Sequence, residues 1–248
     1  MPEILTTPTG RKLAYHKTDS TDKDLPSVIF MGGFMSNMEG TKATAFEQLC
    51  QARGQGYVRF DYSGHGQSSE KFIDGTISSW AEDALYIFDT LTTGPQILVG
   101  SSMGGWMALL TALQRPEHVC GIIGIAAAPD FTRDVAAQFD KTQRAELAEN
   151  GVVYIPSDYG QPYPITQRFL DDGERNILLD GEIALSCPVR LVQGTEDAAV
   201  ADSKPGRIKN ALTSTDVTVD IIDGGDHSLS RPQDIAFLDE KIREISIA

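Results

Sequence analysis

The run from Gly100 to Gly104, with the sequence GSSMG, constrains the fold of this chain more than any other stretch. It follows the short apolar run 96–99, which predicts a strand, and precedes residues 105–114, which are compatible with a helix. The pattern G-x-S-x-G between a strand and a helix is typical of a sharp turn that exposes its central serine, here Ser102. The same pattern also arises by chance as a turn of small residues, so the remaining chain must decide between the two.

Strand-like and helix-like runs alternate over most of the sequence. Residues 4–7 and 12–16 predict a hairpin, and the other expected strands are 27–31, 57–60, 96–99, 119–128, 189–193 and 217–222. The expected helices are 41–53, 77–91, 105–114, 201–212 and 232–245. This alternation is typical of βαβ units, so we predict an α/β fold with a mostly parallel, eight-stranded sheet flanked by helices.

The alternation is interrupted between residues 129 and 187. Residues 132–150 predict a charged amphipathic helix, and two short helices are expected at 167–170 and 174–179. We interpret 129–187 as a helical lid inserted over the edge of the sheet, rather than as a second domain. The core then consists of residues 1–128 and 188–248.

Charge and cysteine content narrow the function classes. The formal net charge of −14 argues against nucleic acid and anionic membrane surfaces as partners. No apolar run reaches the roughly 18 residues that a membrane span needs. The N-terminal residues 1–15 show no signal core and no arginine-rich leader, and Cys50, Cys120 and Cys187 lie far apart without a metal-binding pattern. We expect a cytoplasmic protein with reduced thiols and without metal or cofactor.

A serine hydroxyl becomes a useful nucleophile only when a base accepts its proton. In a sheet of this kind the order along the chain is serine, acid, histidine, each just after a strand. Only His227 among the four histidines follows the last predicted strand, whereas the others precede Ser102 or lie in a polar connection (His16, His65 and His118). The alternative for His227 is a surface loop residue.

The acid of such a triad should follow the strand 189–193. Asp197 is the favoured candidate there, ahead of Glu196, although it could instead be a turn or capping residue before the next helix. Asp223 and Asp226 are nearer to the histidine in sequence but lie on its own loop. The acid must reach the ring nitrogen opposite the serine, which favours a residue from another strand end.

Attack on a carbonyl builds negative charge on its oxygen, which two backbone N–H groups should meet. We expect these from Met103, after the candidate nucleophile, and from Phe34, in the glycine-containing turn after strand 27–31. A tight turn without catalytic role is the alternative. Candidate substrate contacts, each of which could instead serve packing, are Gly33, Met35, Trp106, Tyr154, Tyr159 and Tyr163.

The loop after strand 57–60 contains Asp61 and the run Ser63 to Ser68. A metal or phosphate site is conceivable there. We favour a structural role, because Asp and Ser side chains in such loops bond to nearby backbone. On this view, His65 could line the rim of the site.

With these residues placed, the chain resembles the α/β-hydrolases over nearly its whole length. Within that family it is similar to mitochondrial acyl-protein thioesterases (depalmitoylases) of animals, which are also described as acyl-glucuronide esterases of mycophenolic acid. The stretches that carry the similarity are 30–36, 40–43, 59–64, 94–106, 187–191 and 214–217. Gly32 departs from the histidine or proline usual at its position, and the missing leader favours a bacterial relative.

The resemblance implies that Ser102, Asp197 and His227 form the family's triad. The expected activity is that of a serine hydrolase acting on a small-molecule ester or acyl thioester, with an acylated protein as a further candidate substrate. Alternatives using the same triad are a short-chain carboxylesterase, a peptidase or a carbon–carbon bond hydrolase. A non-catalytic binding protein of the same fold is the alternative from another class.

Overall fold

An eight-stranded sheet forms the centre of the computed structural model, which describes residues 1–156 and 162–247. Its strand order is β1-β2-β4-β3-β5-β6-β9-β10, antiparallel at β1, β2 and β4 and parallel from β4 onwards. The strands are β1 (Glu3–Thr6), β2 (Lys12–Thr18), β3 (Ser27–Met31), β4 (Tyr57–Phe60), β5 (Gln96–Ser101), β6 (Val119–Ile125), β9 (Val189–Gly194) and β10 (Val217–Ile222). The predicted eight-stranded, mostly parallel sheet is confirmed.

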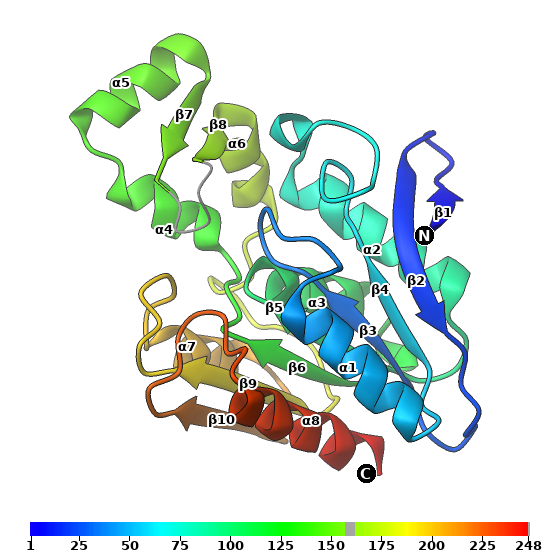
Figure 1. Cartoon of the computed structure of the whole chain (residues 1–248). Coiled ribbons are helices and arrows are strands. Elements are labelled where there is room, and N and C mark those ends of the chain that lie inside the picture. Colours follow the sequence, from blue (N-terminus) through cyan, green and yellow to red (C-terminus); the bar gives the residue numbers. More distant parts are fainter. Residues whose placement is uncertain (157–161, 248) are drawn as a thin grey trace.

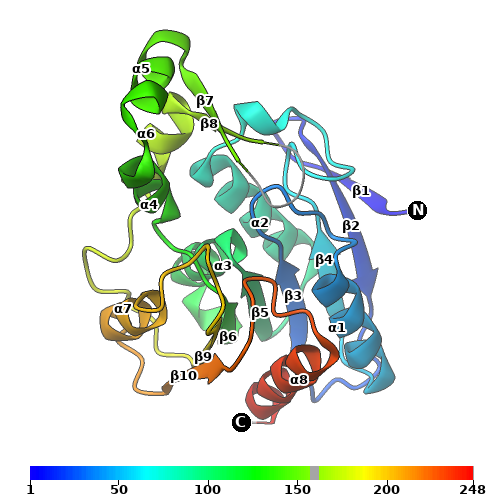
Figure 2. The same ribbon diagram turned by 60° about the vertical axis from the view of Figure 1, so that its left-hand side comes forward.

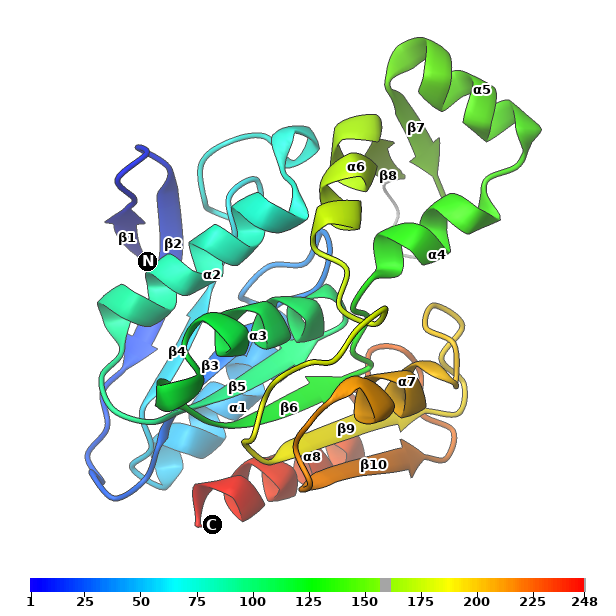
Figure 3. The ribbon, with the colours of Figure 1, turned by 180° about the vertical axis from the view of Figure 1, so that it is seen from behind.

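Helices cover both faces of the sheet. Figure 1 shows α1 (Thr41–Ala52) and α8 (Pro232–Ser246) on one face. Figure 3, from behind, shows α2 (Ile77–Leu91), α3 (Met103–Gln114) and α7 (Lys204–Ala211) on the other. Two short 3₁₀ helices complete the connections, η1 (Phe72–Asp74) and η2 (Pro116–His118). The strands β4 and β5 are buried along their whole length, as expected for parallel strands covered on both faces.

Each face of the sheet has its own apolar core. One core packs the apolar stripe of α2, including Trp80 and Ile87, against α3 and the sheet. The other packs Phe46 of α1 and Ile242 of α8 against the opposite faces of the same strands. Because the strands are fixed from both sides, the loops at their carboxyl ends start from rigid positions.

The helices and strands of the segment 129–187 stand beyond the carboxyl ends of the central strands, and the stretch after α6 runs back to the start of β9 (Figure 2, Figure 3). It contains α4 (Phe131–Gln138), α5 (Lys141–Asn150), α6 (Gln167–Arg175) and an antiparallel pair of strands, β7 (Val152–Ile155) and β8 (Tyr163–Thr166). The strand pair was not expected from the sequence. The segment therefore combines helices with a small sheet.

The predicted helix over 132–150 is wrong in its continuity. The chain leaves the helical conformation at Phe139, and Asp140 begins a new helix by accepting a hydrogen bond from Gln143 N at 2.8 Å. The Gln143 side chain bonds back to Asp140 N at 3.0 Å, which completes a capping box. The two short helices expected at 167–170 and 174–179 are instead one helix, α6, which Thr166 caps.

Asp130, at the start of the segment 129–187, binds the stretch that follows α6. Its carboxylate accepts hydrogen bonds from the amides of Leu178 and Leu179, at 2.9 and 2.8 Å. Asp130 is buried and adopts a left-handed backbone conformation, with φ of 62°. The start of the segment and the stretch after α6 are thus held at one point.

No helix in the described part of the chain is long and apolar enough to cross a membrane. The three cysteines are free thiols, and burial raises the pKa of Cys50 to about 12.

Candidate active site

Ser102 occupies a strained turn between β5 and α3. Its backbone has φ of 54° and ψ of −119°, a combination that L residues rarely adopt. Its N–H donates to Ile125 O at 2.9 Å, and its carbonyl accepts from the amides of Gly105 and Ala128. These bonds to β6 and α3 hold the conformation, as expected where backbone strain serves a site.

The glycines on either side of Ser102 are required by close backbone contacts. A Cβ on Gly100 would lie 2.3 Å from Gly104 O, and one on Gly104 would lie 2.0 Å from Met31 O. Neither carbonyl can move without shifting a strand or helix. The two glycines therefore permit the close crossing of β5, α3 and β3 that presents the serine.

The structure brings the three predicted triad side chains together. Ser102 Oγ lies 3.1 Å from His227 Nε2, and His227 Nδ1 lies 2.9 Å from Asp197 Oδ2. When Nδ1 donates its proton to the carboxylate, Nε2 carries the lone pair that faces the serine hydroxyl. The three residues follow β5, β9 and β10, whose carboxyl ends share one edge of the sheet.

Asp197 has an environment that favours the ionised carboxylate. Its side chain is fully buried, and its Oδ1 accepts from the amides of Ala199 and Val200 at 2.8 and 3.0 Å. Its Oδ2 accepts from Gln193 Nε2 at 2.7 Å as well as from His227. Burial alone would raise the pKa of Asp197, but the hydrogen bond and charge of His227, together with the bonds from the Val200 and Ala199 amides, lower it below its ordinary value.

The competing carboxylates do not contact the imidazole. Glu196 is exposed, and the Asp226 carboxylate accepts from Ser228 Oγ and Leu229 N, within its own loop. Asp223 is also exposed. Geometry therefore favours Asp197 as the partner of His227.

Two supporting residues were missed by the sequence reasoning. Gln193 is the residue before the last of β9, where a buried amide directly after the apolar residues Leu191 and Val192 was an available signal. Lys42, on α1, donates to Ser228 O and, at 3.4 Å, to Ser230 Oγ, so it holds the loop that carries His227. Burial lowers the pKa of Lys42 to about 8. Nothing in the local sequence links Lys42 to a loop 186 residues later.

The turn after β3 lies beside the serine. A Cβ on Gly33 would contact Ser101 O and Ser102 Cβ, both at 3.4 Å. Within the described residues the Phe34 amide donates no hydrogen bond. The Met103 amide opens α3, where N–H groups have no partner inside the helix. Both expected oxyanion donors therefore have uncommitted N–H groups within the described residues, one directly after Ser102 and the other directly after Gly33, which lies against Ser102.

The Phe34 side chain is the hub of an aromatic cluster. Its ring centroid lies 4.8 Å from that of Phe72, 5.5 Å from Phe131, and 5.4 Å from both Tyr163 and Phe169. Phe72 belongs to η1, whereas the other three belong to the segment 129–187. The segment therefore packs directly on the residue beside the candidate nucleophile.

The predicted substrate contacts fall into different environments. Tyr163 contacts Phe34, and Met35 is 38% exposed beside it. Tyr154 is 53% exposed on β7, and Tyr159 lies outside the described residues. Trp106 is completely buried and donates its indole N–H to Asn176 O at 3.1 Å. Trp106 is therefore packed in the core, which fits the packing alternative, and its role as a substrate contact stays a prediction.

The loop after β4 binds itself, as expected for a structural role. The Asp61 carboxylate accepts from Met38 N at 2.7 Å and Gln67 N at 2.8 Å, and Ser68 Oγ donates to Asp61 O. His65 is buried rather than placed at the rim of the site. Among the described residues, no three His, Cys, Asp or Glu side chains are arranged to hold a metal ion.

A doubly covered parallel sheet, with a serine at a strained strand-to-helix turn and an aspartate and a histidine after later strands, is the arrangement of the α/β hydrolases. Residues 26–154 match the family described as alpha/beta hydrolase fold, and the chain belongs to that family.

The chain is 37% identical over 237 residues to the human palmitoyl-protein thioesterase ABHD10, mitochondrial, covering 95% of this chain and 76% of that protein. The structure of alpha/beta hydrolase domain-containing protein 10 from mouse matches with 35% identity and a TM-score of 0.90, over 99% of this chain and 98% of that one. A putative hydrolase from Agrobacterium vitis matches over the same shares of both chains, with 38% identity and a TM-score of 0.94.

Proposed function

We propose that this hydrolase cleaves acyl thioesters or esters through a serine-bound acyl intermediate, with Ser102 as the nucleophile. The observation that carries the proposal is the continuous hydrogen-bonded chain from Ser102 through His227 to Asp197, with distances of 3.1 and 2.9 Å. A serine, a base and an orienting carboxylate in this geometry are the parts that nucleophilic acyl transfer requires.

The chemistry runs in two halves. His227 Nε2 accepts the hydroxyl proton while Ser102 Oγ bonds to the carbonyl carbon, and the amides of Phe34 and Met103 stabilise the resulting oxyanion. The carbon–sulfur or carbon–oxygen bond breaks, His227 protonates the leaving group, and the acyl group stays on Ser102. A water molecule then gives a proton to His227 while its oxygen bonds to the acyl carbon. The bond between that carbon and Ser102 Oγ breaks, the acid leaves, and His227 returns the proton to Ser102 Oγ, while Asp197 stabilises the imidazolium in both halves.

The substrate class rests on the relatives. Relatives that are 37% identical to this chain over 237 residues are named palmitoyl-protein thioesterases. This supports an acyl thioester, including one on a protein, as the substrate. Residues 129–187 serve as the lid, with Tyr163 and Met35 as candidate contacts. A carboxylic ester uses the same machinery, and the cytoplasmic location stays a prediction.

The nucleophile is tested with a fluorophosphonate probe, which bonds covalently to activated serines. We expect the wild-type protein to be labelled and Ser102→Ala to remain unlabelled. Ser101→Ala is the matched control, because Ser101 is the neighbouring serine of the same turn and should leave labelling in place. Labelling that persists in Ser102→Ala would exclude Ser102 as the nucleophile.

The substrate class is tested with matched acyl thioesters and acyl esters of increasing chain length. A preference for long-chain thioesters supports a depalmitoylase-like enzyme. A flat preference for short-chain esters instead indicates a carboxylesterase. Labelling without turnover of either series would direct attention to amide or carbon–carbon bond substrates.

A further inference from the structure

The turn from Gly33 to Ser36 fixes the direction of the Phe34 amide. Gly33 O accepts hydrogen bonds from Ser36 N at 3.2 Å and Ser36 Oγ at 2.8 Å. The peptide bond that joins Gly33 to Phe34 is trans, so its N–H points opposite to its carbonyl. One side of the turn is therefore held by Ser36, and Phe34 N–H is left on the other side.

The next residue of the turn is strained and needs its own support. Met35 has φ of 54°, in the left-handed region that costs a non-glycine residue about 1 kcal/mol or more. Its amide donates to His65 Nε2 at 3.3 Å. This bond comes from the loop after β4 and is the contact that ties the Met35 peptide to the body of the protein.

One neutral form of His65 satisfies both of its ring nitrogens. His65 Nδ1 lies 3.2 Å from Ser63 O, a pure acceptor, so Nδ1 must carry the proton. Nε2 is then unprotonated and can accept from the Met35 amide. Burial lowers the pKa of His65 to about 4, which keeps the ring in this neutral form near neutral pH.

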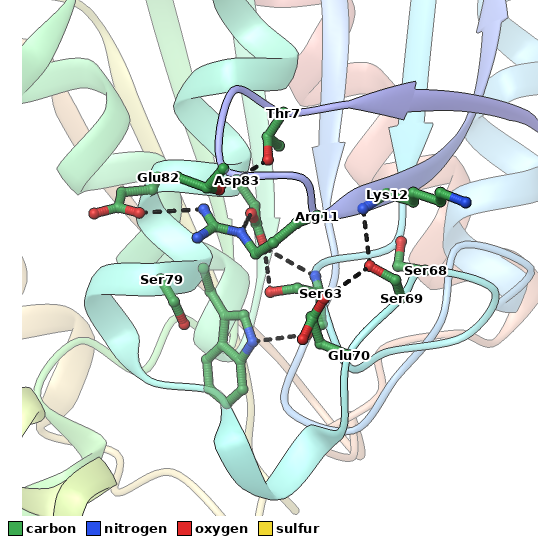
Figure 4. Close-up of polar contacts among 12 residues, drawn as sticks. Thr7, Arg11, Lys12, Ser63, Ser68, Ser69, Glu70, Ser79, Glu82 and Asp83 are labelled. Atoms are coloured by element: carbon green, nitrogen blue, oxygen red, sulfur yellow. Dashed lines mark hydrogen bonds and ion pairs between the residues drawn. The ribbon is translucent and has the colours of Figure 1, made fainter.

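Ser63 is itself held by the ion pair between the buried Asp83 and the partly buried Arg11. Its N–H and hydroxyl both donate to Asp83 Oδ2, at 2.9 and 2.5 Å, and Arg11 Nε donates to Asp83 Oδ1 at 2.9 Å. Figure 4 shows Arg11, Asp83 and Ser63 joined in this order. Trp80 Nε1 also donates to Ser63 O, at 3.0 Å. The acceptor that orients His65 is thus immobile.

We propose that His65 is a positioning residue for the oxyanion turn, holding the Phe34–Met35 peptide through the Met35 amide while the chain Arg11–Asp83–Ser63 fixes the imidazole. The inference rests on the proposed function, in which Phe34 N–H receives the oxyanion. It assigns His65 no contact with substrate.

Two substitutions separate this role from simple packing. His65→Phe keeps a flat ring against Tyr62, Phe72 and Trp80, and Ser63 O keeps its bond from Trp80, but Met35 N–H loses its acceptor. His65→Gln loses the ring but offers an amide oxygen near the position of Nε2. A packing role predicts that Phe is the better replacement, whereas a positioning role predicts that Gln is.

We expect His65→Phe to lower kcat by about 10- to 100-fold with little change in KM, as for a displaced catalytic group, and His65→Gln to recover most of the loss. Tyr62→Phe is the matched control, because within the described residues the buried Tyr62 hydroxyl has no hydrogen-bond partner. It should keep wild-type turnover. Full activity in His65→Phe, or lower activity in His65→Gln than in His65→Phe, refutes the inference.

Hydrogen exchange of the Met35 amide, followed by NMR, tests the same bond without turnover. The amide should be protected in the wild type and in His65→Gln and exchange faster in His65→Phe. An unprotected Met35 amide in the wild type refutes the inference even if His65→Phe does not fold. A wild type without turnover or labelling, but with a protected amide, contradicts the proposed function and leaves the contact between His65 and Met35 established.

Discussion

The substitution Asp197→Asn should remove most of the activity while changing only one functional group. Oδ1 of Asp197 accepts from the amides of Ala199 and Val200, so an asparagine must place its own oxygen there. Its NH₂ group then takes the position of Oδ2, where Gln193 Nε2 and His227 Nδ1 now find an acceptor. A donor at that position forces the proton of His227 from Nδ1 to Nε2.

The wrong tautomer explains the size of the expected loss. With the proton on Nε2, His227 presents N–H to Ser102 Oγ and can no longer accept the hydroxyl proton. The same substitution in a serine protease triad lowers kcat about 10⁴-fold, equivalent to roughly 5 kcal/mol of transition-state stabilisation. We expect kcat/KM of Asp197→Asn to fall by about this factor.

The measurement is hydrolysis of an acyl ester or thioester by wild type and variant, with the rate of fluorophosphonate labelling as a second readout. Glu196→Gln is the matched control, because it neutralises the exposed carboxylate one residue away and should keep wild-type activity. A loss smaller than about tenfold in Asp197→Asn, or an equal loss in Glu196→Gln, would refute the assignment of the acid.

Three further predictions concern stability, each measured by urea unfolding. Gly104→Ala should lower the free energy of unfolding by about 3 kcal/mol or more, because its Cβ would lie 2.0 Å from the carbonyl oxygen of Met31 in β3. Gly206→Ala is the control: the glycine is exposed in helix α7 with open space around it, so alanine should raise the free energy of unfolding by about 0.5–1 kcal/mol. Between about pH 6.5 and 4, His65 is protonated in the unfolded chain but not in the folded chain. The free energy of unfolding of the wild type should therefore fall with decreasing pH more steeply than that of His65→Gln. Parallel dependence of the two unfolding free energies on pH would contradict this. Asp130→Asn should lower the free energy of unfolding by about 1–3 kcal/mol, because the asparagine side chain has one oxygen where the carboxylate accepts from two backbone N–H groups. Proteolysis within residues 129–187 should also become faster. An unchanged rate of cleavage would contradict the role of Asp130 in holding this segment.

The sequence predicted the sheet and the elements beside Ser102 because both depend on local patterns. Buried parallel strands are short apolar runs, and the turn around Ser102 requires glycines at fixed spacing. Asp197 and His227 could be chosen because the ends of parallel strands meet at one edge, so chain order alone places their loops together.

The remaining contacts depend on the packing of distant segments. Lys42 reaches the loop after His227, and His65 reaches Met35, through contacts that no local pattern encodes. Trp106 could be a core residue or a pocket residue by its type alone, and its burial depends on the direction in which α3 packs on the sheet. The pair β7 and β8 was missed because Pro164 and the tyrosine-rich stretch obscure strand alternation.

The hydrogen bonds from Leu178 and Leu179 to Asp130 have a consequence for how residues 129–187 can be replaced. Because one buried carboxylate receives the amides of Leu178 and Leu179, the start of the insertion and the stretch after α6 are held at a single point. The segment is also held by other contacts with the core, such as those of Asp172 with Ser78 N and of Phe131 with Phe34, which a replacement segment would have to reproduce. An exchange of residues 131–177 for the corresponding stretch of a relative would retain both anchor points. If residues 129–187 serve as the lid, as proposed, such an exchange tests whether this segment determines which acyl group is cleaved.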